Sequence, residues 1–147
     1  MTREGEPGGE LRVDGVIETA LHVESVPRAM RFYEEVLGLE AMVHTETFAA
    51  LDAGRRTVLL LFAQGSSTAG TQSAGGFVPG HDTRGPSHLA FAVAGAAELE
   101  RWVARLEACG VSIESRVTWP RGGTSVYFRD PDGHSVELLT PGLWPNY

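Results

Sequence analysis

The sequence predicts an α+β fold in which two βαβββ modules in tandem form a curved, barrel-like mixed sheet around a central cavity. The first observation is a repeated order, in which an alternating segment, a segment with helical spacing and three further alternating segments occur twice. The second is the offset of the repeat, because aligning the strand–helix junctions pairs Val23 with Val93 and Phe32 with Trp102, each pair 70 residues apart. The third is the length of 147 residues, which suits one domain over residues 15–147.

The first module is expected over residues 15–63. Alternating apolar residues predict a strand at 16–23, and apolar residues at helical spacing predict a helix at 27–37. Ser25 is a suitable N-cap for that helix and Gly38 a suitable stop, because serine accepts a bond from a free backbone N–H and glycine tolerates left-handed geometry. Three strands complete the module, at residues 40–45, 47–52 and 57–62.

The second module is expected over residues 86–141 and repeats this order. A strand at 88–93 is followed by a helix at 96–109, whose apolar residues form one stripe. Three strands follow, near residues 111–117, 124–129 and 135–140.

Residues 64–85 separate the two modules and are rich in Gly, Ser and Thr. A segment this long and polar is uncommon as a compact turn, so we expect either a linker or a lid over the cavity. Because it contains few apolar residues, it should be the most mobile internal segment. Phe77 is one of its few apolar side chains, and we expect it to contact a bound substrate if the segment closes.

Charge and composition exclude several classes of partner. Acidic residues outnumber basic ones by 19 to 12 and no basic cluster exceeds Arg55–Arg56, so binding to nucleic acid is not expected. The single cysteine, Cys109, excludes an internal disulfide and suits a reducing compartment. The absence of a basic-then-apolar leader and of a long apolar run predicts a soluble, cytoplasmic protein with no membrane partner. We expect a disordered tail at 1–14 and a short C-terminal tail at 142–147.

Residues on one face of the first strand of each module form a candidate cavity wall. The apolar residues of these strands face the helix, so the alternate residues line the bare side of each sheet. In the first module these are Glu18, Ala20 and His22, and in the second they begin with His88 and Ala90. Small residues beside one polar group predict a cavity with a functional side chain in its wall.

The last strand of the second module adds a carboxylate. In the run DPDGHSVELLTPG, a turn at Asp130–Gly133 precedes a short strand that carries Glu137 on one face. The simplest interpretation is a solvated carboxylate on an edge strand, because most glutamates are exposed. His134 is expected as a surface residue of the turn.

These residues carry a resemblance to a known family. The repeat, the run FYEEVLGLE, the strand GPSHLAFAV and the ending YFRDPDGHSVELLTP together resemble the vicinal-oxygen-chelate superfamily over residues 16–141. That superfamily includes glyoxalases, extradiol dioxygenases, fosfomycin-resistance enzymes and bleomycin-resistance proteins. The resemblance is specific for the fold, whereas this scaffold carries several chemistries and some non-catalytic binders.

The resemblance implies a particular set of metal ligands. In metal-dependent members the ligands come from the first and last strands of each module, and His88 and Glu137 occupy two of these positions. Glu18 stands where those members carry a first histidine, and the fourth position falls in residues 58–61, which are all apolar. A three-ligand site of Glu18, His88 and Glu137 remains, with open positions for water or substrate, and it suits Zn, Fe, Mn or Ni.

Each of these residues also has a structural interpretation. Taken alone, each is better explained by a structural role, Glu18 as a solvated or salt-bridged residue at a strand end and His88 as a hydrogen-bonded core histidine. Two carboxylates that converge in one cavity repel each other, however, so one must take up a proton or a cation must bind between them. Together the three residues therefore favour a bound divalent cation.

Further residues are candidates for catalysis and substrate binding. Glu18 and Glu137 are candidate catalytic groups, and His22 is a candidate general base or substrate contact, although a buried hydrogen-bonded histidine fits equally well. The run WPRGGTSVYF resembles fosfomycin-resistance enzymes, in which the equivalents of Ser125 and Tyr127 line the substrate site. The C-terminal tail offers no arginine to hold a phosphonate. The substrate-binding candidates are His22, Phe77, Ala90, Trp119, Ser125 and Tyr127.

The leading functional hypothesis is a metal-dependent enzyme that acts on a small substrate with two adjacent oxygens. Its metal stabilises a developing enolate or alkoxide, a step shared by isomerases, lyases and dioxygenases. The alternatives are a metal-free protein that sequesters a drug or metabolite, and a fosfomycin-resistance-like transferase. We also expect a homodimer with its sites at or near the interface, because the bare sheet faces need cover.

Overall fold

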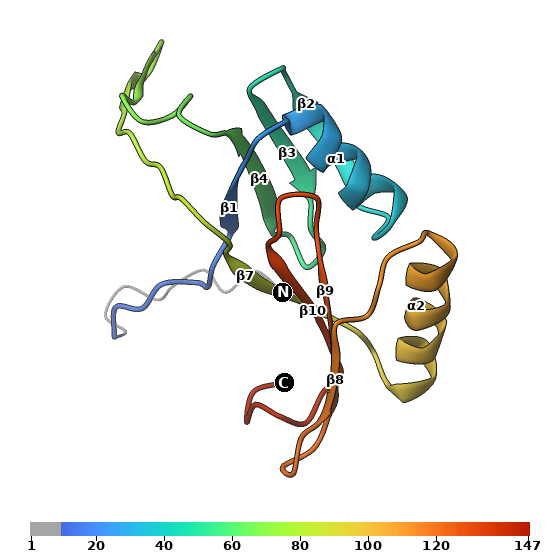
Figure 1. Ribbon diagram of the computed structural model, residues 1–147. Coiled ribbons are helices and arrows are strands. Elements are labelled where there is room, and N and C mark those ends of the chain that lie inside the picture. Colours follow the sequence, from blue (N-terminus) through green and yellow to red (C-terminus); the bar gives the residue numbers. More distant parts are fainter. Residues whose placement is uncertain (1–9) are drawn as a thin grey trace.

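The computed structural model describes residues 10–147, which form two four-stranded sheets, two helices and a small hairpin (Figure 1). The predicted disordered tail at 1–14 lies outside the described residues as far as residue 9, and residues 10–14 are exposed coil. The predicted α+β fold is confirmed. The two sheets curve but do not join into one closed barrel within the chain. Among the described residues, no helix is both long and apolar enough to cross a membrane.

The two sheets have the same strand order, as the sequence repeat predicts. The first sheet is ordered β1-β4-β3-β2 and the second β7-β10-β9-β8, so in each one the first and last strands of the module lie side by side and run parallel. The first module contains β1 (Glu18–Val23), α1 (Val26–Glu35), β2 (Glu40–His44), β3 (Phe48–Asp52) and β4 (Val58–Ala63). The second contains β7 (His88–Ala92), α2 (Ala96–Ala108), β8 (Ser115–Thr118), β9 (Thr124–Arg129) and β10 (Ser135–Leu139).

The start of the first helix follows the local sequence closely. The Ser25 side chain accepts a hydrogen bond from the backbone N–H of Arg28, and Pro27 lies in the first turn, where its missing N–H costs nothing. Gly38 has a φ of 73°, the left-handed geometry expected of a residue that follows a helix. The largest difference from a predicted boundary is at the start of β8, because residues 111–114 are not in a strand. The N–H of Val111 donates to the carbonyl of Leu106, so the chain is still closing the end of α2.

A single hydrophobic core joins the two modules. The sheet face that carries Leu21, Leu59, Val126 and Val136 is covered by the helices, and these side chains are almost fully buried. Burial of this apolar area is the main force that holds the helices on the sheets. The opposite face of each sheet is not covered by a helix of the same chain, and it holds the polar residues considered below.

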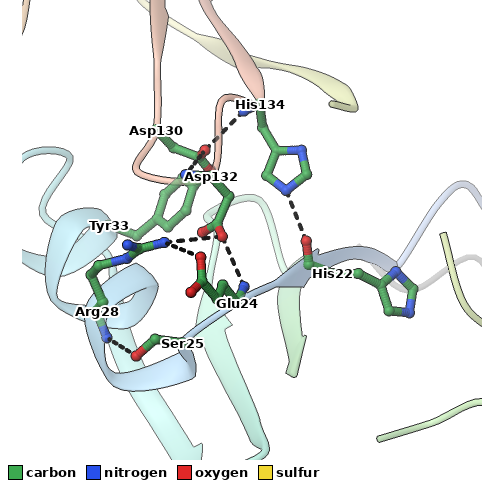
Figure 2. Close-up of polar contacts among 8 residues, drawn as sticks. All are labelled: His22, Glu24, Ser25, Arg28, Tyr33, Asp130, Asp132 and His134. Carbon is green, nitrogen blue, oxygen red and sulfur yellow. Dashed lines mark hydrogen bonds and ion pairs between the residues drawn. The ribbon is translucent and has the colours of Figure 1, made fainter. Parts of the chain in front are cut away.

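Both ends of α1 are held by residues of the second module. At its start, the Asp132 carboxylate accepts hydrogen bonds from the Glu24 backbone N–H at 2.8 Å and from the Arg28 guanidinium at 3.2 Å (Figure 2). At its end, the Arg105 guanidinium donates to the carbonyls of Val36 and Glu35 at 2.9 and 2.8 Å. A carboxylate at the N-terminus and a cation at the C-terminus both complement the helix dipole. These contacts fix the second module against the first.

His134 is buried at this joint, so the prediction of a surface residue is wrong. Its side chain is 2% exposed. Its Nδ1 accepts a hydrogen bond from the Ser87 backbone N–H at 2.8 Å, and its Nε2 donates to the His22 carbonyl at 3.0 Å (Figure 2). A ring that accepts at one nitrogen and donates at the other is neutral. His134 therefore links β1, the start of β7 and the start of β10.

The segment between the modules forms a projecting arm. It contains the hairpin of β5 (Thr71–Ser73) and β6 (Gly76–Val78), which extends away from both sheets (Figure 1). Ser67 closes the base of the arm, since its carbonyl accepts from the His81 N–H at 3.0 Å and its hydroxyl donates to the His81 carbonyl at 2.7 Å. The arm is thus more ordered than a flexible linker at its base.

Candidate metal and substrate site

The bare face of the second sheet brings together the polar residues that the sequence singles out. In the register of the sheet, His88 lies opposite Ser135, and Glu137 lies between Ala90 on β7 and Tyr127 on β9. Directly opposed residues of neighbouring strands project to the same face. His88, Ala90, Tyr127 and Glu137 therefore share one surface, as the alternation of the sequence predicts.

His88 and Glu137 form a pair at the centre of this face. The Nε2 atom of His88 lies 3.2 Å from Oε1 of Glu137, and its Nδ1 atom lies 3.0 Å from the Ser135 carbonyl oxygen. A carbonyl only accepts, so Nδ1 carries the hydrogen, and Nε2 faces the carboxylate either with a proton of its own or, in a neutral ring, with its lone pair. Two acceptors this close require a proton or a cation between them.

The second oxygen of Glu137 is held by a chain of hydrogen bonds. The fully buried Ser125 hydroxyl donates to Oε2 at 2.5 Å, and the Trp119 indole N–H donates to that hydroxyl oxygen at 2.8 Å. Glu137 itself is 6% exposed. These bonds fix the carboxylate in place and leave Oε1 directed at His88. Trp119 and Ser125, predicted as substrate-binding residues, thus contact the site through Glu137.

Tyr127 lies beside the pair and keeps its proton. Burial raises the pKa of its hydroxyl, and the nearby Glu137 carboxylate raises it further, while a hydrogen bond with Ser125 acts in the opposite direction. Its ring centroid is 6.2 Å from that of His88. At neutral pH the phenol is therefore available as a hydrogen-bond donor on the same face as the predicted ligands.

Glu18, the third predicted ligand, lies on the other sheet. It is exposed at the start of β1, opposite Val58 of β4. Among residues 10–147, no group of three or more His, Cys, Asp or Glu side chains is placed to hold a metal ion within one chain. The structure therefore brings together His88 and Glu137 but not Glu18, whose role stays a prediction. Imidazole nitrogen and carboxylate oxygen are nevertheless common ligand atoms for zinc and for divalent transition metals.

His22 is enclosed rather than open to a substrate. Its Nδ1 atom lies 2.8 Å from the Thr83 hydroxyl, and its Nε2 atom lies 3.1 Å from Nδ1 of His81. The ring also stacks against Phe62, with the centroids 5.8 Å apart. Burial lowers the pKa of His22, and the neighbouring His81 lowers it further, so the ring is neutral near pH 7. The geometry is that of a buried, hydrogen-bonded histidine, and its role in catalysis stays a prediction.

Phe77 does not cover this face within one chain. It lies in β6 at the projecting hairpin and is 60% exposed, and its neighbour Val78 is exposed as well. Its predicted contact with substrate would need movement of the arm or contact with a second chain.

Sequence reasoning missed Arg55, which the fold brings to the second module. Arg55 lies in the turn between β3 and β4, yet it lines two cavities with Ala90 and Ala92 of β7. The larger cavity has a volume of about 340 Å³. Only the packing of one module against the other places this cation there, so no local pattern signals it.

Comparison with known proteins agrees with this architecture. Residues 15–138 match the family model described as the Glyoxalase/Bleomycin resistance protein/Dioxygenase superfamily. The chain belongs to this superfamily, and the predicted resemblance is confirmed.

Individual relatives carry several names. Glutathione transferase FosA of Serratia marcescens is 33% identical over 126 residues, covering 84% of this chain and 78% of that protein. Metallothiol transferase FosB of Staphylococcus haemolyticus is 26% identical over 133 residues, covering 89% and 86%. Among solved structures, the lactoylglutathione lyase from Agrobacterium tumefaciens has a TM-score of 0.82 and 34% identity, covering 91% of this chain and 98% of that chain. The fold is therefore shared by relatives with a transferase name and a lyase name.

Proposed function

We propose that this protein is a metal-dependent enzyme that binds a divalent cation at His88 and Glu137 and acts on a small substrate with two adjacent oxygens. The observation that carries the proposal is the pair of facing ligand atoms, His88 Nε2 and Glu137 Oε1, 3.2 Å apart. A divalent cation bound between them would supply Lewis-acid stabilisation of negative charge on the substrate oxygens. The choice among isomerase, lyase and dioxygenase reactions depends on the substrate.

The residues around the pair have distinct roles in this proposal. Ser135 and Ser125 orient the two ligands. The Ser135 carbonyl accepts a hydrogen bond from His88 Nδ1, and the Ser125 hydroxyl donates to Glu137 Oε2, so the atoms that face away from the cation are held. Tyr127 places a protonated phenol beside them, where it can donate to a bound substrate oxygen or return a proton to it.

Glu18 of the partner subunit completes the ligand set in a proposed homodimer. Within one chain Glu18 lies on the other sheet, and both sheets keep one face without a helix. Exposed apolar side chains at Met42, Val43, Phe77 and Trp144 also need cover. Two carboxylates and one neutral imidazole would balance the charge of a divalent cation and leave positions open for substrate.

Mixing two inactive variants tests this arrangement. Glu18→Ala and His88→Ala should each bind Mn²⁺ or Zn²⁺ weakly when purified alone, as measured by isothermal titration calorimetry. In a dimer of one chain of each kind, one site has both changes and the other has neither. Random exchange of chains should therefore restore about a quarter of the wild-type sites. Each homodimer, unfolded and refolded alone, serves as the control.

The outcomes separate the parts of the proposal. Restored binding supports a site shared between two chains. No restoration, with wild-type protein binding one ion per chain, would show that the site lies within one chain or that Glu18 is not a ligand. No binding by the wild type would overturn the metal site and favour the metal-free binding protein.

A transferase of the fosfomycin-resistance type is a second candidate function. Two relatives carry transferase names, and Ser125 and Tyr127 occupy the face where the predicted site lies. Mass spectrometry of fosfomycin incubated with glutathione, metal and protein tests it directly. An adduct formed by wild type but not by Glu137→Gln would support the transferase, and no adduct at high protein concentration would exclude that substrate pair.

A further inference from the structure

A second cavity lies on the bare face of the second sheet, next to the His88–Glu137 pair. It has a volume of about 240 Å³. Its lining is apolar and aromatic except for one charged residue among those the structure describes, Arg55. The full lining is Arg55, Ala90, Phe91, Ala92, Leu139, Trp144 and Tyr147.

The cavity is adjacent to the predicted ligands through the register of the sheet. Ala90 of β7 pairs with Glu137 of β10, and Ala92 pairs with Leu139. Leu139 is two residues beyond Glu137 on the same face, so the two side chains are about 7 Å apart along the strand. A molecule that lies in this cavity and extends about 7 Å along the strand from Leu139 therefore reaches Glu137.

The turn that carries Arg55 has a defined and unusual backbone. Arg55 and Arg56 have φ values of 50° and 62°, in the left-handed region that residues with a Cβ atom seldom adopt. The turn is closed by hydrogen bonds from the Ala53 N–H to the Thr57 carbonyl and from the Thr57 N–H to the Gly54 carbonyl. These bonds hold the turn in one conformation and place Arg55 at the cavity.

The donors of Arg55 are not used by the described part of the chain. Its guanidinium carbon lies 5.2 Å from the centroid of the Tyr147 ring, a cation–π contact. Within residues 10–147 it makes no ion pair, and none of the side-chain hydrogen bonds there involves it. The guanidinium is therefore positioned by an aromatic ring while its N–H groups remain available to a ligand.

Tyr147 is itself held firmly. Its hydroxyl donates to the Leu139 carbonyl at 2.8 Å and accepts from the Val93 N–H at 3.1 Å. The C-terminal residues are closed on themselves by a bond from the Gly142 N–H to the Tyr147 carbonyl. The aromatic wall of the cavity is therefore fixed to the ends of β7 and β10.

We propose that this cavity binds an anionic group of the substrate, a carboxylate or another oxyanion, and that Arg55 is the residue that binds it. This inference deepens the proposed function. The chelation of the two adjacent oxygens by a metal rests on that function, whereas the binding of the anionic group by Arg55 does not. The chain has a net charge of −7, so an anionic molecule needs a local cation to bind. The planar guanidinium fork matches a carboxylate in two parallel hydrogen bonds. Alanine floor and aromatic wall suit a flat apolar body between the anion and the two chelating oxygens.

Two matched probes test the charge of the substrate. The probes are 3,4-dihydroxybenzoate and 3,4-dihydroxybenzamide, which share two adjacent hydroxyls and a flat ring and differ in the negative charge. Their affinities for the Mn²⁺-loaded protein are measured by calorimetry for the wild type, Arg55→Gln, Arg55→Lys and Arg56→Gln. Arg56→Gln is the matched control, because it removes the same charge from the next residue of the same turn.

The proposal expects the wild type to bind the benzoate at least about tenfold more tightly than the amide. Arg55→Gln should lose this preference, Arg55→Lys should keep part of it, and Arg56→Gln should keep it all. Equal preference in the wild type and Arg55→Gln would overturn the role of Arg55. If the dimer covers the cavity, neither probe should bind the wild type, and that result would also overturn the role of Arg55.

A separate titration with Mn²⁺ distinguishes failure of the metal site from failure of the anion site at Arg55. Arg55→Gln should bind Mn²⁺ as tightly as the wild type, since it contacts no predicted ligand. If the wild type itself binds no metal, the proposed function fails while the same probe pair, titrated against metal-free protein, still tests Arg55. Weaker overall binding with an Arg55-dependent preference for the benzoate would then support the anion site on its own.

Discussion

The bare faces of the two sheets carry a histidine each, and the two histidines have opposite surroundings. His22 in the first module has neighbours at both ring nitrogens and a phenylalanine against its ring. His88 in the second has one nitrogen satisfied by a carbonyl and the other directed at the Glu137 carboxylate. His22 thus fastens the segment between the modules to β1, whereas His88 directs one ring nitrogen at a carboxylate.

This difference teaches that the partners of a histidine, more than its burial, indicate its function. His22 is 4% exposed and His88 is about half exposed, so burial alone would favour His22 as the special residue. Both nitrogens of His22 contact uncharged groups, whereas Nε2 of His88 faces a carboxylate, which attracts a proton or a metal cation.

The largest effect on metal affinity is expected from removal of the His88 imidazole. His88→Ala should lower the affinity for Mn²⁺ or Zn²⁺ by at least about 100-fold, and Glu137→Gln should lower it strongly as well. Glu18→Gln should have a smaller effect, because an amide oxygen still coordinates. Calorimetry gives the affinities, and urea unfolding of His88→Ala should change by less than about 0.5 kcal/mol. His44→Ala, an exposed histidine on β2, is the control, and equal loss of affinity there would contradict the assignment.

The next effect concerns a histidine with both nitrogens satisfied, His134. His134→Ala leaves the Ser87 N–H and the His22 carbonyl without partners at a buried joint. The free energy of unfolding should fall by about 2–4 kcal/mol, as measured by urea denaturation. A loss no larger than that of His44→Ala would show that water replaces these bonds freely.

Tyr33 lies at the same joint, and its substitution should lower the free energy of unfolding less. Its hydroxyl donates to the Asp130 carboxylate at 2.7 Å in a fully buried position, and burial raises its pKa, so it stays protonated. Tyr33→Phe removes only the oxygen and should cost about 2 kcal/mol, because a bond to a charged acceptor is lost. Tyr127→Phe, on the bare face, serves as the comparison and should change unfolding much less.

The smallest effect is a pH dependence that belongs to His22. Burial lowers its pKa below the ordinary value of 6.5, so the unfolded chain takes up the proton at a higher pH than the folded chain does. Its contribution to stability is therefore complete above that value and is lost as the pH falls toward the folded pKa. Urea unfolding between about pH 8 and about pH 5 should show a steeper loss for the wild type than for His22→Asn. Parallel curves would mean that the ring is not shielded.

The sequence predicted the elements and one face of the site, for identifiable reasons. Alternation in HLAFA and SVELL placed His88 and Glu137 on the bare side, because a strand turns every second residue the same way. The offset repeat predicted two modules with the same sequence of elements, which is confirmed, and the two sheets also share one strand order.

The remaining features depend on contacts between distant segments. The place of Arg55 follows from the docking of one module on the other, and the burial of His134 follows from a carbonyl far away in the chain. Neither leaves a local pattern. In our proposal the role of Glu18 as a ligand depends on a second chain. Neither its neighbours in sequence nor the fold of one chain therefore establishes that role.

Crystals grown with Mn²⁺ would show whether a cation binds between His88 and Glu137. Anomalous difference density shows where the ion lies without any assumption about activity. The account predicts one peak per chain, roughly 2.0–2.3 Å from His88 Nε2 and from Glu137 Oε1. A protein that crystallises in Mn²⁺ with no peak there, or with its only peak elsewhere, would contradict the account.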